Sequence, residues 1–536
     1  MGSTEESMAG RRLWTNGRII TLDSDDSVYR EMLTRDERIE AVGDNLREQL
    51  GQAGGVEVID LGGRTVVPGF ADCHVHFTTT ALGLVEPRYD RVGSLAQMQE
   101  KVREEVRRLP DGTFRGWAWD QSSYPEGRTP NKWDLDAVAP DLPVALMRVG
   151  GNVTVVNSKG WDLLGLPADL PGIERSASGE PTGLLRGDAN LFAQIEVHSQ
   201  LTDEDHAAAY AAFASHAARQ GITTVHAVEG EAPTLRRGEV AHPNADVAYL
   251  LGQRPSLPLD VVIWDTQVVH TSGDVARVKE SGLPRIGGDI FADGVLGIAW
   301  VPGGARAAIS EPYLDGDRSL GHLLIEDGVL TDLLIQSLQL DLQIGVHAVG
   351  DRAIGQFLDC WEAALKEVPR VDARPRIEHG ILPTDAQISR AADLGVVFST
   401  QPAFEWQSGG PNGRYAQRLG PVRVRGTHPL RQLTRAGVVV VGGSDSPANV
   451  TDPLLGIHAC VHHASEENRL SPIEALRVFT SNAACAAFEE KVKGSLEKGK
   501  QADFVVLAQD PTEQGIAIKD IQVVRTVHRG KDSFVL

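Results

Sequence analysis

The sequence predicts an α/β protein built on a distorted (β/α)8 TIM barrel, with a small β-sandwich domain made from both termini and an insertion over the barrel mouth. Helix-like and strand-like segments alternate along most of the chain after about residue 70, which predicts the barrel. Polar residues repeatedly stand where the strand-like segments end, and barrels of this class build their active sites there. Similar short strands at the two chain ends predict the sandwich.

Size and charge limit the classes of partner. The 536 residues fit a large barrel with an accessory domain, and 52 basic against 73 acidic residues give a net charge of -21. This charge makes nucleic acid and anionic membrane surfaces poor partners, and no apolar run approaches the roughly 18 residues of a spanning helix. We therefore expect a small-molecule substrate and no membrane or nucleic-acid partner. A homo-oligomer, with a dimer as the working assumption, is the remaining partner prediction.

The four cysteines show no CxxC spacing, and the N-terminal segment MGSTEESMAGRRLW lacks the apolar core of a secretory signal. Neither a disulfide framework nor export is indicated. A reducing, cytoplasmic location is the expectation.

The two chain ends supply the predicted sandwich, which we bound at residues 1–67 and 492–536. Near the N-terminus, Asn16-Gly17 stands between two apolar runs, a hairpin signal. The segments ADFVVLAQD and IQVVRTVHRGK near the C-terminus are also strand-like. Residues 68–491 form the predicted barrel.

The first barrel strand carries a pair of histidines. In VVPGFADCHVHF (66–77), Pro68-Gly69 ends one strand and 70–77 forms the next. Residues two apart on a strand point to the same face, so His74 and His76 can approach one metal ion together.

Later helix-strand units deliver further polar residues. In LTDEDHAAAYAAFASHAARQGITTVHAV (201–228), Thr202 is the expected helix cap and Gly221 the helix end. The following units end at His347, His379, Gln401 and Ser444-Asp445. Taken singly, His347 and His379 are better explained as packed core histidines. Together with the first-strand pair and Asp445 they predict one metal site, formed by His74, His76, His347, His379 and Asp445.

A long segment rich in tryptophan and turns, about 80–200, interrupts the barrel pattern. We predict that it inserts over the barrel mouth, where lids and specificity loops usually lie.

Several motifs carry a family resemblance. VVPGFADCHVHF, GITTVHAV, VHAVGDRAIGQFLD, RIEHG, STQP, GGSDSP and GSLEKGKQADFVVL occur in an order and spacing similar to the amidohydrolase superfamily of metal-dependent hydrolases. PVALMRVGGNVTVVNS, GEPTGLL and IFADGVLG resemble its branch similar to N-substituted formamide deformylase. The resemblance spans nearly the whole chain.

This resemblance implies a mononuclear or dinuclear divalent metal centre, with zinc the expected ion. It makes His74 and His76 first-strand ligands, His347 and His379 the ligands of strands five and six, and Asp445 the ligand of strand eight. Asp445 is also the implied general base, because a carboxylate that touches both the metal and its water can take the water's proton.

The fourth strand departs from the branch. Its usual metal-bridging carbamylated lysine is replaced by Asp289 in GGDIFADG. An aspartate reaches less far than a lysine carbamate and so is less able to bridge two ions, which favours one ion over two. With one ion, His379 is free to orient the attacking water or the substrate carbonyl. The alternative is that Asp289 or Asp293 becomes a direct ligand after a backbone shift, and Asp293 is at least as well explained as a helix-cap or turn aspartate.

A second departure concerns substrate recognition. RVGGNVTVVN has Gly150 and Asn152 where the branch commonly has Asp-Gly-His, and an asparagine cannot shuttle protons near neutral pH. The candidate substrate-binding residues, each of which also has a purely structural explanation, are Asn152, Trp119, His226, Arg148, Gln401 and Trp406.

The predicted activity is hydrolysis of a C–N bond other than a peptide bond, of amide or N-acyl type, in a small, partly apolar substrate. A deaminase or hydrolase of a heterocyclic C–N bond is the alternative. The superfamily's deaminases place a glutamate three residues after the fifth-strand histidine, where this chain has Gly350. A metal-binding or ligand-binding barrel without catalysis is the third reading.

Overall fold

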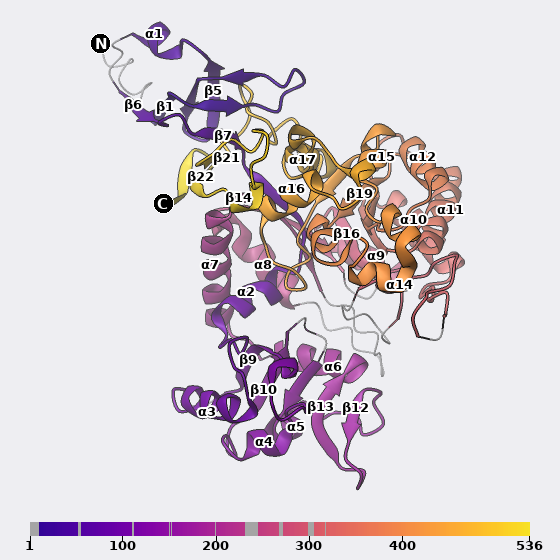
Figure 1. The fold of residues 1–536 in the computed structure, drawn as a ribbon. Helices are drawn as coiled ribbons and strands as arrows, with labels where there is room; N and C mark the ends of the chain where they lie inside the picture. Colours follow the sequence, from indigo (N-terminus) through magenta and orange to yellow (C-terminus); the bar gives the residue numbers. More distant parts are fainter. Residues whose placement is uncertain are drawn as a thin grey trace.

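A parallel eight-stranded barrel lies at the centre of the computed structural model, which describes residues 10–51, 55–109, 112–149, 151, 153–198, 200–230, 245–266, 272–297, 305–316 and 318–536 (Figure 1). The predicted (β/α)8 architecture is confirmed. The strands, in spatial order, are β8 (Phe70–Val75), β14 (Ile222–Glu229), β15 (Asp260–Asp265), β16 (Arg285–Phe291), β17 (Gln343–Ala348), β18 (Arg376–His379), β19 (Val397–Thr400) and β20 (Val440–Gly442).

The first and last strands meet just beyond β20. Val75 and Ser446 form a parallel bridge, and the Asp445 amide donates to the His74 carbonyl oxygen at 2.7 Å. The two segments approach so closely that a Cβ at Gly443 would lie 2.5 Å from the backbone nitrogen of His74. Barrel closure therefore sets Asp445 directly beside the first-strand histidines.

Amphipathic helices surround the barrel and turn back into the next strand. The helix α7 (Asp203–Arg219) begins at Thr202, whose side chain accepts from the Asp205 amide in a capping box, as expected from the sequence. The other barrel helices include α10 (Asp327–Gln339), α11 (Asp351–Glu367), α12 (Asp385–Asp393) and α15 (Leu430–Arg435).

Strands from both chain ends form two sheets that pack on each other. One has the order β5-β4-β1-β6 and the other β23-β22-β21-β7-β2-β3. Trp14 from the first sheet packs edge-on against Phe504 from the second, with ring centroids 4.9 Å apart. The strands are β1 (Arg11–Thr15), β2 (Arg18–Ile20), β3 (Val28–Tyr29), β4 (Glu31–Arg35), β5 (Arg38–Gly43), β6 (Val56–Asp60), β7 (Thr65–Pro68), β21 (Phe504–Leu507), β22 (Val523–His528) and β23 (Lys531–Val535).

Between the first two barrel strands lies a separate five-stranded sheet with its own apolar core, drawn at the bottom of Figure 1. Its order is β12-β13-β11-β10-β9. The elements of this segment are α2 (Phe77–Val85), α3 (Leu95–Val106), β9 (Phe114–Trp119), α4 (Lys132–Asp136), β10 (Val144–Arg148), β11 (Val153–Val156), α5 (Ser158–Leu164), β12 (Ile173–Arg175), β13 (Pro181–Arg186) and α6 (Gly187–His198).

The remaining helices are α1 (Leu46–Leu50), α8 (Ala245–Gln253), α9 (Ser272–Glu280), α13 (Pro402–Ser408), α14 (Arg414–Arg423), α16 (Pro453–Val461), α17 (Pro472–Val478) and α18 (Ser481–Ala486). Over the described ranges, none of the helices has the length and apolar character needed to cross a bilayer.

Candidate metal centre

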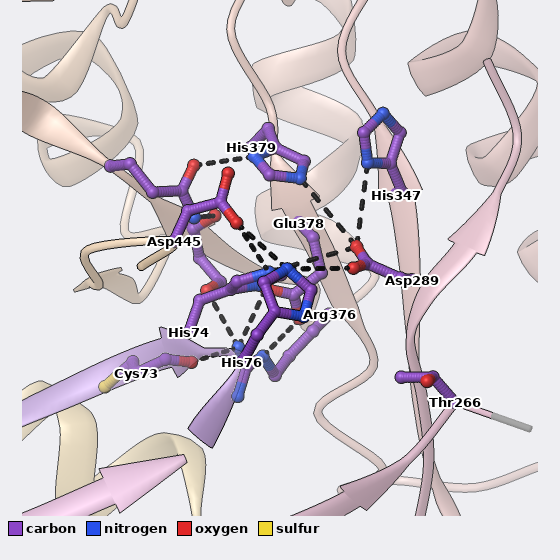
Figure 2. A network of polar contacts seen from close by, with 12 residues as sticks. Cys73, His74, His76, Thr266, Asp289, His347, Arg376, Glu378, His379 and Asp445 are labelled. Carbon is purple, nitrogen blue, oxygen red and sulfur yellow. Dashed lines mark hydrogen bonds and ion pairs between the residues drawn. The ribbon is translucent and has the colours of Figure 1, made fainter. Parts of the chain in front are cut away.

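Four histidines and two aspartates gather at the carboxyl ends of the barrel strands (Figure 2). His74 and His347 lie on β8 and β17, and His379 ends β18, whereas His76 and Asp445 follow β8 and β20. All five residues predicted as a common site are therefore brought together, and Asp289 of β16 joins them.

One half of the cluster is formed by His74, His76 and Asp445. Asp445 Oδ1 lies 3.6 Å from His74 Nε2 and 3.2 Å from His76 Nε2. Donors at about 2.1 Å from one tetrahedral ion lie about 3.4 Å from each other. The spacing of these three side chains therefore matches the coordination shell of a single cation.

Asp289 lies between this group and the other two histidines. Its Oδ2 is 3.5 Å from His76 Nε2, and its Oδ1 is 3.9 Å from His74 Nε2. Oδ1 is also 3.7 Å from His347 Nδ1 and 4.0 Å from His379 Nε2. Every histidine of the cluster thus faces this one carboxylate.

A bulge in β16 explains how a short aspartate reaches the centre. Gly287 pairs with Gly345 of β17 and Ile290 pairs with Val346, so Gly288 and Asp289 are extra residues in β16. Gly287 and Gly288 have φ values of 87° and 98°, which favour glycine, and a Cβ at Gly287 would lie 2.1 Å from the Gly345 oxygen. This is the backbone shift that the sequence left open as an alternative for Asp289.

Asp293 has the structural role considered for it, that of an aspartate that binds backbone amides. Its carboxylate accepts from the backbone amides of Ala308, Val349 and Gly350 at 2.8 to 2.9 Å. Asp293 therefore ties down the loop after β17, and the suggestion that it is a direct ligand is wrong.

Two residues of the cluster have a left-handed backbone. His379 has φ 69° and Asp445 has φ 57°. Non-glycine residues adopt this conformation at some energetic cost, and such residues concentrate at functional sites. Here the conformation turns both side chains inward at the point where their strands end.

Each of three histidines donates its outward ring N–H to a fixed acceptor. His74 Nδ1 is 2.8 Å from Glu378 Oε2, and His379 Nδ1 is 2.7 Å from Gln401 Oε1. His347 Nε2 lies 3.3 Å from the Gly294 carbonyl oxygen. These bonds select the tautomers in which the other nitrogen, with its lone pair, faces the cluster.

Glu378 belongs to a fully buried network beneath the site. Arg376 Nη2 donates to Glu378 Oε2 at 2.8 Å, and its Nη1 donates to His226 Nδ1 at 2.9 Å. The guanidinium also lies 4.3 Å from the centroid of the Trp264 ring. Arg376 thus compensates the charge of Glu378 inside the barrel.

The inward nitrogens support the presence of a cation. His74 Nε2 and His347 Nδ1 are buried, and neither has a hydrogen-bond partner in the part of the chain that the structure describes. Buried polar atoms are nearly always satisfied, so these nitrogens require a ligand. His74 Nε2 has the carboxylates of Asp289 and Asp445 beside it, so a divalent cation is the ligand that fits there. His347 Nδ1 faces Asp289 Oδ1 at 3.7 Å.

The electrostatics agree with that assignment. Burial opposes ionisation of Asp445, yet the hydrogen bond from His76 and the nearby imidazoles hold its pKa below the usual range. Contacts with His347 and the other histidines likewise lower the pKa of buried Asp289. Burial and the charge of His347 lower the pKa of His379 to about 4, so this ring is neutral at pH 7.

A cavity of about 230 Å³ opens on the cluster. His76, Asp289, His347, His379 and Asp445 line one part of it. The insertion contributes Trp117, Met147, Gly151 and Gln194. Apolar side chains come from the end of β16 and from the segments after β17 and β19, and include Phe291, Val349 and Phe404. Both the barrel and the insertion therefore shape the space in which a substrate would lie.

Trp119 does not line this cavity. It is fully buried in the core of the insertion, and its indole N–H donates to the Leu146 oxygen at 2.8 Å. Trp117, two residues earlier, lines the cavity instead. Ala118 between them has φ 70°, which breaks the strand alternation that would give the two tryptophans one common face.

The other predicted substrate contacts also lie away from the cavity wall. Arg148 pairs with Asp120 at 3.2 Å, and Trp406 is 45% exposed and packs edge-on against His458. His226 and Gln401 are buried and serve Arg376 and His379, as described above. Asn152 and Gly150 lie outside the described residues.

Sequence reasoning missed Arg376, Glu378 and the cavity residues Arg414 and Tyr415. A usable signal existed in RIEH. Ile377 is the apolar residue between Arg376 and Glu378, so the period of two puts both charged side chains on the opposite face from it. No comparable pattern marks Arg414 or Tyr415, because a helix outside the barrel presents them to the cavity.

The sequence pattern of the amidohydrolase family matches residues 57–534 of this chain. Two curated relatives are each 28% identical to it. The putative amidohydrolase YtcJ of Bacillus subtilis (strain 168) aligns over 94% of this chain and 95% of its own length. N-substituted formamide deformylase of Arthrobacter pascens aligns over 95% of this chain and 96% of its own length.

Solved structures give the same picture. The crystal structure of an uncharacterized metal-dependent hydrolase from Pyrococcus furiosus is 27% identical to this chain and superposes with a TM-score of 0.76, over 94% of this chain and 100% of that one. A second metal-dependent hydrolase, from Pyrococcus horikoshii OT3, shares the fold with a TM-score of 0.77 at 23% identity, over 95% of this chain and 99% of that one.

Proposed function

The chain belongs to the amidohydrolase family of metal-dependent hydrolases, and from this premise we propose that it cleaves a C–N bond of amide or N-acyl type in a small, partly apolar substrate. The observation that carries the proposal is the convergence of His74, His76, Asp289 and Asp445 at donor spacings of 3.2 to 3.9 Å. The similarity to N-substituted formamide deformylase supports the bond type.

We assign one divalent ion, with zinc as the expected metal, to these four side chains. His347 and His379 face Asp289 from its other side and complete the polar end of the cavity. When bound, the ion supplies a Lewis acid that polarises the scissile carbonyl and acidifies water.

The proton transfers belong to Asp445. Its carboxylate is held ionised, contacts His76 and lines the cavity, so it can accept a proton from the attacking water. The same group then returns the proton to the amine as the C–N bond breaks. The net reaction adds one water to the amide and releases a carboxylic acid and an amine.

His379 orients the reactants. Its Nδ1–H is committed to Gln401, and its low pKa keeps Nε2 unprotonated at pH 7. Nε2 therefore accepts a hydrogen bond from the attacking water and aligns it with the carbonyl carbon.

The heterocycle deaminase reading is less well supported. The glutamate that such an enzyme would need falls at Gly350, where a Cβ would lie 2.0 Å from the Ala308 oxygen. A side chain of any kind is therefore excluded at this position without a change in the backbone.

A substrate panel tests the proposal. The purified protein, loaded with zinc and analysed for metal content, would be assayed with formamides, larger amides, ureas, lactams and amino-substituted heterocycles. We expect release of an amine and a carboxylic acid from formamides or amides. Ammonia release from heterocycles without amide cleavage would contradict the proposal. Zinc-loaded Asp393→Asn, altered at an exposed helix position, is the control and should behave as the wild type does.

A further inference from the structure

We propose that the substrate of this enzyme carries a carboxylate, and that Arg414, Tyr415 and Ser408 bind it. The inference rests on the proposed amide hydrolysis and specifies its substrate class. The three residues stand where α13 ends and α14 begins, and all three line the cavity that contains the metal cluster.

Most other neutral polar side chains of the cavity wall already have partners. Gln194 Nε2 donates to the Gly151 oxygen at 2.8 Å, and Gln407 Nε2 donates to Asn449 Oδ1 at 2.8 Å. The Thr266 hydroxyl donates to the Glu229 oxygen at 2.9 Å. These bonds hold the side chains in place along the wall.

Tyr415 differs from them. Its side chain is only 3% exposed and its ring stacks on His428, yet its hydroxyl has no hydrogen-bond partner among the residues that the structure describes. The Ser408 hydroxyl, 8% exposed, also lacks a partner within the same described ranges. Neither hydroxyl is among the fully buried polar atoms without a partner, so both are open to the cavity they line and can donate to a ligand there.

Arg414 supplies the charge. Its side chain is exposed to solvent, and it is the only lysine or arginine among the described residues lining the cavity; it forms no ion pair with any described carboxylate. The neighbouring arginines are engaged elsewhere: Arg418 donates to the Leu296 and Gly297 oxygens, and Arg306 pairs with Asp315. A guanidinium with free donors at a cavity wall is suited to bidentate binding of a carboxylate.

The charge distribution gives the substrate a direction. Among the described residues lining the cavity, the acidic ones are Asp289 and Asp445, which belong to the metal cluster, so Arg414 is the protein group that attracts an anion. Apolar side chains including Trp117, Phe291 and Phe404 line the same cavity. The inferred substrate therefore has a scissile amide at the cluster, an apolar portion against these rings and a carboxylate at Arg414.

The first test compares two formamides that differ only in the carboxylate, N-formylphenylalanine and N-phenethylformamide, with zinc-loaded enzyme. We expect Arg414→Met to lower kcat/KM for N-formylphenylalanine about 10- to 100-fold, the usual range for a lost hydrogen bond to a charged group, and to leave N-phenethylformamide nearly unchanged. Tyr415→Phe should show a smaller loss of the same selectivity. Arg425→Met, which removes an exposed arginine outside the cavity, is the matched control and should change neither rate.

A binding measurement separates this inference from the proposed reaction. Calorimetry would compare hydrocinnamate with hydrocinnamyl alcohol on zinc-loaded wild type and Arg414→Met. Preferential binding of hydrocinnamate that disappears in Arg414→Met supports the site even if neither formamide is hydrolysed, in which case only the proposed reaction fails. Equal losses on both formamides, or hydrocinnamate affinity that Arg414→Met leaves unchanged because the carboxylate binds the metal, would overturn the inference.

Discussion

His74 Nδ1 and Glu378 Oε2 lie 2.8 Å apart, and both side chains are completely buried. Burial alone would lower the pKa of His74, but this bond and the carboxylates of Asp289 and Asp445 raise it. The contact holds the ring so that Nε2 faces the cluster. Arg376 binds Glu378 in turn, so the orientation of the His74 ring depends on both Glu378 and Arg376.

Glu378→Gln should therefore weaken metal binding without altering any group that faces the cavity. A glutamine keeps the shape of the side chain but loses the charge that fixes the His74 tautomer, and such outer partners are typically worth about 10- to 100-fold in metal affinity. Competition with a chromophoric chelator measures the zinc dissociation constant. Glu367→Gln, at an exposed position of α11, is the control, and an unchanged dissociation constant in Glu378→Gln would refute the role.

Asp445→Asn should lower kcat by about 10² to 10⁴, the range expected for loss of a general base. The fold should survive, because the backbone contact from Asp445 to His74 is retained. Steady-state kinetics with metal analysis of the same sample and a melting curve make the measurement. Full activity in zinc-loaded Asp445→Asn would remove Asp445 from the mechanism.

Removal of the metal should abolish activity and lower the melting temperature. The ion binds donors that only the folded chain brings together, so it stabilises the native state by mass action. Dialysis against a chelator followed by zinc titration should restore both properties at one ion per chain. A requirement for two ions per chain would instead place His347 and His379 in a second site shared through Asp289.

Gly443→Ala should destabilise the protein and weaken zinc binding together. The new Cβ would lie 2.5 Å from the His74 nitrogen and 2.8 Å from its Cβ, which forces β8 and the loop after β20 apart. Overpacking of this kind costs about 1 to 3 kcal/mol. Gly252→Ala on α8, where the new Cβ meets nothing within 4 Å, is the control in denaturant unfolding. Equal stability of the two variants would contradict the close approach.

Glu405 should give the stability a specific pH dependence. Burial raises the pKa of this carboxyl from 4.5 to about 7, even though Thr427 donates to it at 2.8 Å. The folded state then binds the proton of Glu405 more tightly than the unfolded state does, so this proton stabilises the fold. Its contribution to the unfolding free energy is complete below pH 4.5 and is lost as the pH rises through 7.

In the wild type, Glu405 should lower the unfolding free energy by up to about 3 kcal/mol as the pH rises between these values. Glu405→Gln should not show this decrease. Urea unfolding of both proteins across the range measures the difference. Parallel pH profiles for wild type and variant would show that Glu405 is already ionised in the folded state.

The sequence predicted the barrel and the metal cluster because both depend on local patterns. Alternating helices and strands fix the class of fold, and the carboxyl ends of parallel strands meet at one rim. His74, His347, His379 and Asp445 were therefore recognisable from their places at strand ends. Asp289 was recognised as a candidate, but its reach depended on a bulge that the Gly287-Gly288 pair permits and does not by itself require.

The substrate-contacting residues were less predictable. Trp119 was chosen on the basis of its residue type and its place in a mouth segment. Because Ala118 has a positive φ, Trp117 and Trp119 point to different sides, and Trp117 is the one that lines the cavity. Arg148 was chosen for its charge, which Asp120 compensates. Neither outcome follows from spacing along the chain.

The sequence by itself determined which side chains of this protein can bind a cation and in which order the barrel strands present them. Tertiary structure alone decided that Asp289 faces all four histidines, that Glu378, itself bound by Arg376, holds His74, and that Arg414 and Tyr415 line the same cavity as the cluster. The physical reason is distance. Periodicity sets the direction of a side chain within its own element, whereas contacts between residues hundreds of positions apart depend on how bulges, left-handed residues and neighbouring elements pack.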